Sequence, residues 1–321
     1  MKKNSIAVII PVYKAHDTIV NTLYSVFFQR HVDYCVYLVV DGEPNGSYDY
    51  LHDKFNLNIF YLTDNVGPGV ARQYGIDHTH EPFISFIDSD DTYLSSLSLY
   101  YQQKPLLDSP TNVLISTDFL EEKKDTSLNL RTKDMVWMHG KMYRRAFLDK
   151  YNIRFNDSRA NEDVGFNTQC QCYANKDEQI YMSQDVTYLW QWRDNSIVRN
   201  NDQEYSFTSS IEGYVVNKTD AFKKVIDNQG ITDAVQFFIM KSMMHLFKKY
   251  LAAMMRAPKQ VKHAKKYARK FYRSMYKKYI TPEYMDKAEK TAFISAGFKS
   301  EDEFNEFVKF KKQLEVKKRK H

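Results

Sequence analysis

The chain contains few cysteines, and their number excludes the common cysteine-based scaffolds. Only Cys35, Cys170 and Cys172 are present among 321 residues. An odd and sparse set of thiols argues against a disulfide framework, and no second pair of Cys or His residues gives zinc-ligand spacing. We therefore interpret the three thiols as small buried side chains.

Long apolar runs are also absent. The N-terminal stretch 5–12 is only long enough for a strand and contains Pro11, so it lacks the apolar region of a signal peptide. No other run approaches the roughly 20 apolar residues of a membrane-spanning helix. The sequence therefore predicts a soluble, cytoplasmic protein, with peripheral contact to a membrane surface as an open alternative.

Charge is divided unevenly along the chain, although the net charge is only +6. Residues 241–321 hold 23 Lys and Arg against 8 Asp and Glu, a balance of +15. Residues 1–240 hold 23 against 32, a balance of −9. This division indicates two parts with different roles. We expect a catalytic domain at 1–204 and a basic helical C-terminal region at 205–321.

The first third alternates the patterns of buried strands and amphipathic helices. Continuous apolar runs predict strands at 6–12, 35–40, 59–62, 83–87 and 113–117. Helices are expected at 17–29 and at about 70–78, after Gly67-Pro68-Gly69. Strands that alternate with helices imply an α/β fold with a mostly parallel sheet, and ligands of such sheets bind beyond the carboxyl ends of the strands.

Three carboxylates crowd the end of the fourth of these strands, in the sequence Phe86-Ile87-Asp88-Ser89-Asp90-Asp91. Like charges at one strand terminus repel one another and are costly unless a cation lies among them. Mg²⁺ and Mn²⁺ take carboxylate and phosphate oxygens, so a divalent ion that carries a diphosphate would suit this position. A solvated acidic loop or a helix N-cap is the alternative interpretation of this motif alone.

An ordered set of segments strengthens the first interpretation. It comprises Ile9-Ile10-Pro11-Val12-Tyr13-Lys14, Val39-Val40-Asp41-Gly42, the helix start at 65–76, the Asp88 cluster, and then 140–148, Asn161-Glu162-Asp163 and 188–196. Over roughly residues 4–200 this set resembles the inverting glycosyltransferases of family 2, which have the GT-A fold. The expected architecture is therefore a GT-A domain with a C-terminal helical extension.

The resemblance implies a metal-dependent hexosyltransferase that moves a sugar from a nucleoside-diphosphate donor, with UDP expected, to a hydroxyl of a glycan or polymer. It implies Mn²⁺ or Mg²⁺ as the cofactor, with Asp90 and Asp91 as metal ligands. Asp163 is implied as the base that deprotonates the acceptor hydroxyl. The residues implied in donor binding are Pro11, Tyr13, Asp41, Arg72, Asp88, Ser89, Asp90, Arg193 and Ser196.

Simple chemistry gives several of these residues a task. Asp41 can accept a hydrogen bond from the imide N–H of uracil, and Asp88 can accept from ribose hydroxyls. Arg72 lies one turn inside a helix whose N-terminus favours anions, although pairing with an Asp is an equally good use of it. Turn formation by Asp41, packing by Tyr13 and a helix start at Asn161 are alternatives to functional roles.

One histidine and two tryptophans lie beside these motifs. A lone His such as His139 is more often structural than catalytic. Trp190 and Trp192 could stack on a sugar face, but core filling is the better interpretation for at least one of them.

The basic tail is a separate feature. Residues 262–278 alternate cations with aromatic side chains, and Tyr267, Phe271 and Met275 recur every fourth residue, which predicts one buried stripe. The cations fit either a solvated surface or a polyanion surface that acts through phosphate attraction and aromatic stacking. Nucleic acid, a teichoic-type polymer and anionic membrane lipid all fit such a surface.

Three functions therefore compete. Sugar transfer to a glycan or polymer leads. Glycosylation of a hydroxymethylated base in DNA has only the charge of the tail in its favour. A non-catalytic nucleotide-binding or polyanion-binding protein is disfavoured because Asp41, Asp88, Asp90 and Asp163 are all present.

Overall fold

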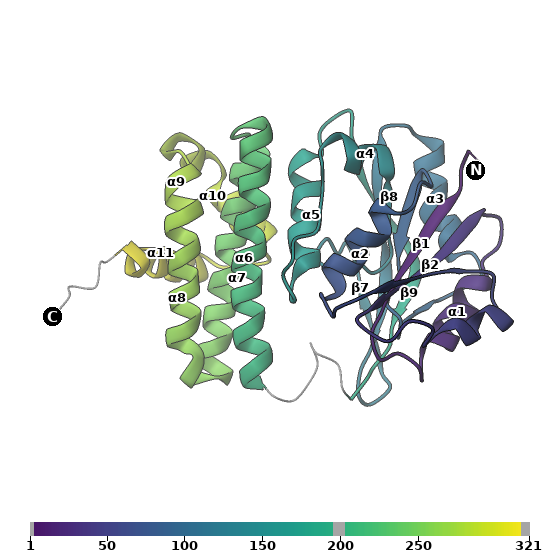
Figure 1. Cartoon of the computed structure of the whole chain (residues 1–321). Helices are drawn as coiled ribbons and strands as arrows, with labels where there is room; N and C mark the ends of the chain where they lie inside the picture. The colour runs from purple at the N-terminus through teal and green to yellow at the C-terminus, as the bar shows by residue number, and fades with distance from the viewer. Residues whose placement is uncertain (1–2, 195–202, 316–321) are drawn as a thin grey trace. The chain divides into compact units, whose positions relative to one another are not determined.

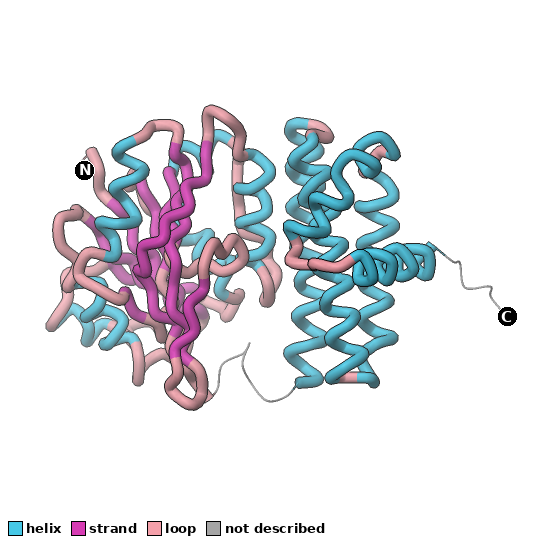
Figure 2. The backbone as a smooth tube through the Cα atoms, turned by 180° about the vertical axis from the view of Figure 1, so that it is seen from behind, coloured by secondary structure: helices cyan, strands magenta, loops and turns pink. Residues whose placement is uncertain are grey.

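The computed structural model describes residues 3–194 and 203–315. The chain divides into two compact units, Met1–Ser196 and Ile197–His321, and each is described here by itself. All the described strands lie in the first unit, whereas the described part of the second contains helices and loops only (Figure 1, Figure 2).

Within residues 3–194, nine strands form one sheet with the order β3-β2-β1-β4-β8-β6-β9-β5, and β7 pairs with β6. Strands β1 to β4 pair in parallel, which confirms the predicted parallel arrangement. Beyond β4 the sheet is mixed, because β8 pairs antiparallel with both β4 and β6. The strands are β1 Ile6–Val12, β2 Tyr34–Asp41, β3 Asn58–Leu62, β4 Phe83–Phe86, β5 Thr92–Tyr93, β6 Asn112–Glu122, β7 Leu128–Arg131, β8 Lys141–Arg144 and β9 Gln179–Trp190.

Helices cover both faces of this sheet (Figure 1). Side chains of β1 alternate between the two faces, and Val8 and Ile10 share a core with Leu23 of α1 and Leu99 of α3. Ile9 points to the opposite face, against Gly75 of α2. The helical segments are α1 Ile19–Phe27, η1 Asp49–Asp53, α2 Pro68–Asp77, α3 Ser98–Asp108, α4 Arg145–Lys150 and α5 Glu162–Tyr173.

Two glycines permit close approaches near the carboxyl ends of the strands. Gly42, after β2, has a φ of +75°, and a Cβ added there would lie 2.2 Å from the backbone nitrogen of Asn65. A Cβ added at Gly69, in the first turn of α2, would lie 2.7 Å from Cγ of Glu162. The loop after β2 and the start of α5 can therefore both pack against the start of α2.

The second unit is helical throughout its described residues. Helix α8 continues through a π-helical turn, Tyr272–Tyr276, into α9, Lys277–Tyr279. Thr232 and Thr281 cap the two helices that follow them, since their hydroxyls accept backbone N–H groups at 3.2 Å. The remaining segments are α6 Gln203–Gln229, α7 Asp233–Arg256, η2 Pro258–Gln260, α8 Val261–Phe271, α10 Pro282–Ser295 and α11 Glu301–Glu315.

Aromatic side chains form the core of this unit. The ring of Phe247 in α7 contacts those of Phe298, Phe307 and Phe310, with centroids 5.2–5.7 Å apart. The predicted stripe of Tyr267, Phe271 and Met275 is confirmed, because all three side chains are buried. Among the described residues, no helix combines the length and the apolar character that crossing a bilayer requires.

We expect Gly42→Ala to destabilise the first unit more than Gly46→Ala. Both glycines have a positive φ, +75° and +86°, so each alanine costs about 1–2 kcal/mol in backbone conformation. Only at Gly42 does the new Cβ meet backbone atoms; at Gly46 its nearest neighbour is 3.5 Å away. The overpacking should cost about 1–3 kcal/mol more. Thermal unfolding of both variants measures the difference, and equal losses would contradict this account.

Candidate functional site

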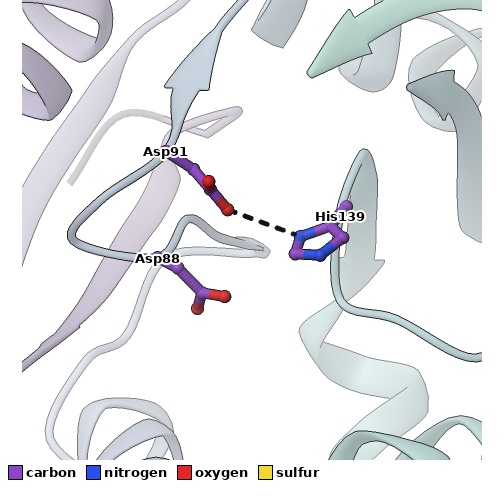
Figure 3. Close-up of side chains that lie close together, drawn as sticks. All are labelled: Asp88, Asp91 and His139. Atoms are coloured by element: carbon purple, nitrogen blue, oxygen red, sulfur yellow. Dashed lines mark ion pairs between the residues drawn. The ribbon is translucent and has the colours of Figure 1, made fainter. Parts of the chain in front are cut away.

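The loop after β4 brings Asp88 and Asp91 together with His139 (Figure 3). The backbone N–H of Asp91 donates to the carbonyl of Asp88 at 3.1 Å, which folds this loop into a turn. His139 precedes β8, and because β8 runs antiparallel to β4, the imidazole reaches the carboxyl end of β4. One ligand atom from each residue lies within 4.8 Å of the others. The three side chains form a candidate cation site.

Asp91 is a buried anchor of this site. Its two carboxylate oxygens accept from the Tyr188 hydroxyl at 2.7 Å and from the backbone N–H of Gln191 at 2.9 Å. Burial, together with the charges of Asp90 and Asp88, raises the pKa of Asp91 well above its usual range. A cation beside this carboxyl would therefore stabilise its charged form.

His139 lacks a hydrogen-bond partner among the described residues. Both ring nitrogens are buried and unsatisfied, and the ring lies among Trp137, Tyr188 and Trp190. Burial lowers the pKa of His139 to about 4, although Asp88 opposes the shift. Its Nδ1 lies 3.8 Å from Oδ2 of Asp91, but a neutral imidazole makes no ion pair there.

These residues fit a divalent cation. A buried imidazole without a partner is costly, and neutral imidazole is the form that ligates metals. Two carboxylates and one imidazole suit a divalent ion that accepts a nitrogen ligand beside oxygen ligands. Asp90 lies outside this cluster, because its carboxylate is 3.3 Å from Nε of Arg193 and its side chain is 43% exposed. The metal role of Asp90 stays a prediction.

Arg72 joins the acidic loop to the start of α5. Its guanidinium is buried and donates to Asp88 at 2.5 Å and to Glu162 at 2.7 Å. Burial alone would lower the pKa of Arg72, but the two carboxylates outweigh it and raise the pKa. The same pairing holds the pKa of Asp88 below its usual range against the effect of burial. The predicted alternative, Arg72 paired with an Asp, is therefore present, and phosphate contact by Arg72 stays a prediction.

Asp163 lies in the first turn of α5, next to this ion pair. One of its oxygens accepts the backbone N–H of Val164 at 2.7 Å. Burial, followed by the charge of Glu162, raises the pKa of Asp163 well above its usual range, although Arg72 opposes the shift. A carboxyl with a raised pKa is a stronger base than an exposed aspartate. The role of Asp163 as the base stays a prediction.

Asp41 is engaged by the loop before α2. Its oxygens accept the backbone N–H groups of Val66 at 2.7 Å and Gly67 at 2.9 Å, and the side-chain amide of Asn65 at 3.2 Å. A carboxylate has about four acceptor positions, so one position on Oδ1 is left. Recognition of uracil by Asp41 stays a prediction, and it would have to use that position.

The other residues predicted for donor binding occupy varied environments. Pro11 is buried in β1, whereas the ring of Tyr13 is 47% exposed beside the ammonium group of Lys14. Ser89 is partly buried within the acidic loop. Ser196 lies outside the described residues.

Several residues of this region were not assigned a function from the sequence. His139 was interpreted as structural, and Glu162 and Tyr188 had no role. Lys141 is completely buried, with Nζ 3.5 Å from Asp134, and burial lowers its pKa. The segment His139-Gly140-Lys141 was a usable signal, because two ionisable residues flank a glycine at the start of the motif at 140–148.

The sheet, the acidic loop after β4 and the start of α5 define an α/β protein with a candidate site at the carboxyl ends of its parallel strands. The model of the family described as "Glycosyl transferase family 2" matches residues 7–160. Residues 7–160 thus form a glycosyltransferase family 2 domain, as the sequence motifs predicted.

Two curated relatives illustrate the likeness. The Bacillus subtilis "Putative teichuronic acid biosynthesis glycosyltransferase TuaG" is 33% identical over 95 residues, 28% of this chain and 38% of the relative. The Staphylococcus epidermidis "Teichoic acid poly(glycerol phosphate) polymerase" is 23% identical over 201 residues, 56% of this chain and 27% of the relative. The chain thus matches well under two thirds of the length of either relative.

Solved structures confirm the fold. The crystal structure of S. aureus TarS 1-349 in complex with UDP-GlcNAc superposes with a TM-score of 0.67 at 15% sequence identity. The superposition covers 96% of this chain and 92% of that one. At this identity the likeness establishes the GT-A type of fold and nothing finer.

Removing the guanidinium of Arg72 should be strongly destabilising. Arg72→Met leaves Asp88 and Glu162 without their partner in a buried environment, which typically costs about 3–5 kcal/mol. Arg72→Met combined with Glu162→Gln should recover part of the loss, because one uncompensated charge is then gone. Urea unfolding of these two variants and of Glu162→Gln alone measures this. Additive losses would show that the two side chains do not act as a pair.

Proposed function

We propose that the chain transfers a sugar from a nucleoside-diphosphate donor to a hydroxyl group of a polymer, with inversion at the anomeric carbon. The observation that carries the proposal is the link made by Arg72 between the acidic loop and the helix that begins with Glu162 and Asp163. It joins Asp88, which would bind the cation that carries a diphosphate, to the helix start that bears Asp163, a carboxyl of raised pKa.

The proposed chemistry is a single displacement. Asp163 accepts the proton of the acceptor hydroxyl as its oxygen forms a bond to the anomeric carbon. The bond from that carbon to the diphosphate oxygen breaks, and the nucleoside diphosphate departs with the electron pair. Asp88, Asp91 and His139 would hold the divalent ion, which neutralises charge on the leaving group as a Lewis acid.

The nature of the substrates is supported by the relatives. TarS is described in complex with UDP-GlcNAc, and the S. epidermidis relative is named as a teichoic acid polymerase. We therefore propose a UDP-sugar donor and a polymer acceptor of the teichoic type. We also propose the cytoplasmic location and the peripheral membrane contact that the sequence predicted.

Asp163→Asn should abolish transfer while donor binding is kept. The amide is nearly isosteric but cannot take the proton, so kcat should fall about 10²–10⁴-fold with little change in the KM for the donor. Release of nucleoside diphosphate from a panel of nucleotide sugars, with a polymer acceptor present, measures this. A kcat above about a tenth of the wild-type value would place the base elsewhere.

The rate should also depend on pH through Asp163. Because its pKa is raised, the carboxyl is protonated and inactive as a base over a range that extends well above the ordinary value near 4. We expect kcat to rise with pH through this raised pKa. Glu162→Gln removes one cause of the raised pKa of Asp163, so the rise of kcat with pH should occur at lower pH in this variant. An unchanged pH dependence of kcat in this variant would mean that a group other than Asp163 controls the rate.

Binding of the divalent cation should depend on His139. We expect Mn²⁺ to bind the wild-type protein, and His139→Phe to weaken binding at least about tenfold, the loss typical when support of a metal site is removed. Calorimetric titration with Mn²⁺ alone measures this without any substrate. If Mn²⁺ affinity is unchanged in His139→Phe but lost in Asp90→Asn, the ligands are Asp90 and Asp91, as predicted from the sequence, and do not include His139.

A further inference from the structure

A row of cations runs along the outside of α8 and its continuation. Lys262, Lys266, Lys270, Arg273 and Lys277 are all exposed and recur at intervals of three or four residues. At about 1.5 Å of rise per residue, successive charges lie about 5–6 Å apart along the axis, and the row spans about 22 Å. We call these five residues the cation stripe.

The charge of the stripe is not neutralised within its own segment. Residues 234–282 contain 13 Lys and Arg and no Asp or Glu. Within the described part of the chain, the stripe residues make no ion pair or hydrogen bond, and only Lys266 and Lys270 contact a ring, that of Tyr267. Three nearby carboxylates, Glu212, Glu289 and Glu315, are engaged by the hydroxyls of Tyr267, Tyr276 and Tyr272.

Two other cations of α8 have a structural task. Arg269 donates to the backbone carbonyls of Gln313 and Leu314 at 3.2 and 3.3 Å, at the end of α11. Lys265 donates to the side chain of Gln313 at 2.6 Å. These residues brace α11, so they are distinct from the stripe, and a charge-removal experiment must leave them intact.

Four aromatic rings of this segment face inward, and Tyr279 at its end is partly buried. Tyr267 and Tyr272 are 7% and 6% exposed, and Phe271 and Tyr276 are 0% and 1% exposed. Binding of single-stranded nucleic acid combines backbone charge with exposed rings on which bases stack. An amphipathic helix that enters a membrane needs an exposed apolar face. The stripe offers charge alone, which suits a chain of phosphates that carries no bases and no lipid.

We propose that the cation stripe binds a linear phosphodiester polymer of the alditol-phosphate type, through its phosphate groups only. The five exposed charges recur regularly along one helix, so each can meet a separate phosphate of an extended chain. That the bound polymer is the acceptor rests on the proposed function; the binding itself does not.

The test compares two variants of the full chain with equal loss of charge. In the stripe variant, Lys262, Lys266, Lys270, Arg273 and Lys277 are changed to Gln. In the control variant, five other exposed lysines of the second unit are changed to Gln. These are Lys223, Lys287, Lys299, Lys309 and Lys312. Circular dichroism and thermal unfolding establish that both variants are folded.

The probe is poly(glycerol phosphate) freed of lipid, titrated without donor or metal at 50–200 mM salt. Five phosphate contacts predict a slope of log affinity against log salt of about −3.5, which is about a 100-fold loss over this range. The stripe variant should bind at least about tenfold more weakly at 50 mM salt with a slope near zero, whereas the control variant should bind within about threefold of the wild type.

Three results with soluble polyanions would overturn the proposal. They are no binding by the wild type, equal weakening in both variants, and tighter binding of single-stranded DNA with the same number of phosphates. Stripe-dependent binding to phosphatidylglycerol vesicles without binding to the free polymer would also overturn it, in favour of a lipid surface. Because neither donor nor metal is present, failure here is separate from failure of sugar transfer.

Discussion

The buried guanidinium of Arg72 is the constraint on which the first unit depends. It has to be paired, because an isolated charge is too costly in the interior, and its two partners come from opposite parts of the site. Asp88 belongs to the loop after β4 and Glu162 to the start of α5. Gly69 of α2 allows α2 and α5 to approach closely enough for Arg72 to reach Glu162, because the side chain of any larger residue would overlap Glu162. Electrostatic pairing and close packing thus hold the acidic loop and Asp163 in one arrangement before any substrate arrives.

Much of this fold was predictable from local patterns. The apolar runs at β1 to β4 and the glycine-rich start of α2 carry their own signals, because a buried parallel strand needs no partner information to be recognised. The two-residue strand β5 was missed because it is too short to show a pattern, and β7, β8 and β9 were missed as well. Their residues alternate irregularly, and β9 includes register shifts where it pairs with β6, so no simple period marks it. Their positions depend on pairing with β4 and β6, which is tertiary information.

The site was predictable in type but less so in detail. The crowding of Asp88, Asp90 and Asp91 indicated a cation site, and the structure brings two of them together with His139. Which carboxylate turns inward depends on Tyr188 and the backbone of Gln191, about a hundred residues away in sequence, and these anchor Asp91 and not Asp90. The orphaned ring of His139 is likewise visible only in three dimensions. In the C-terminal region, by contrast, the four-residue interval between Tyr267, Phe271 and Met275 was enough to predict that these side chains are buried.

The uniformity of the cation stripe has a kinetic consequence. Five similar charges at similar spacing distinguish no particular repeat of a uniform chain, so a polymer shifted by one repeat makes the same contacts. The alternative registers are then nearly equal in free energy, and the barrier between them is only the partial loss of a few screened contacts at a time. Proteins held to a polyanion in this way slide along it without dissociating. An enzyme anchored through such a stripe would decorate neighbouring repeats of one chain in succession, and added salt would shorten each run before it lowered the rate of a single transfer.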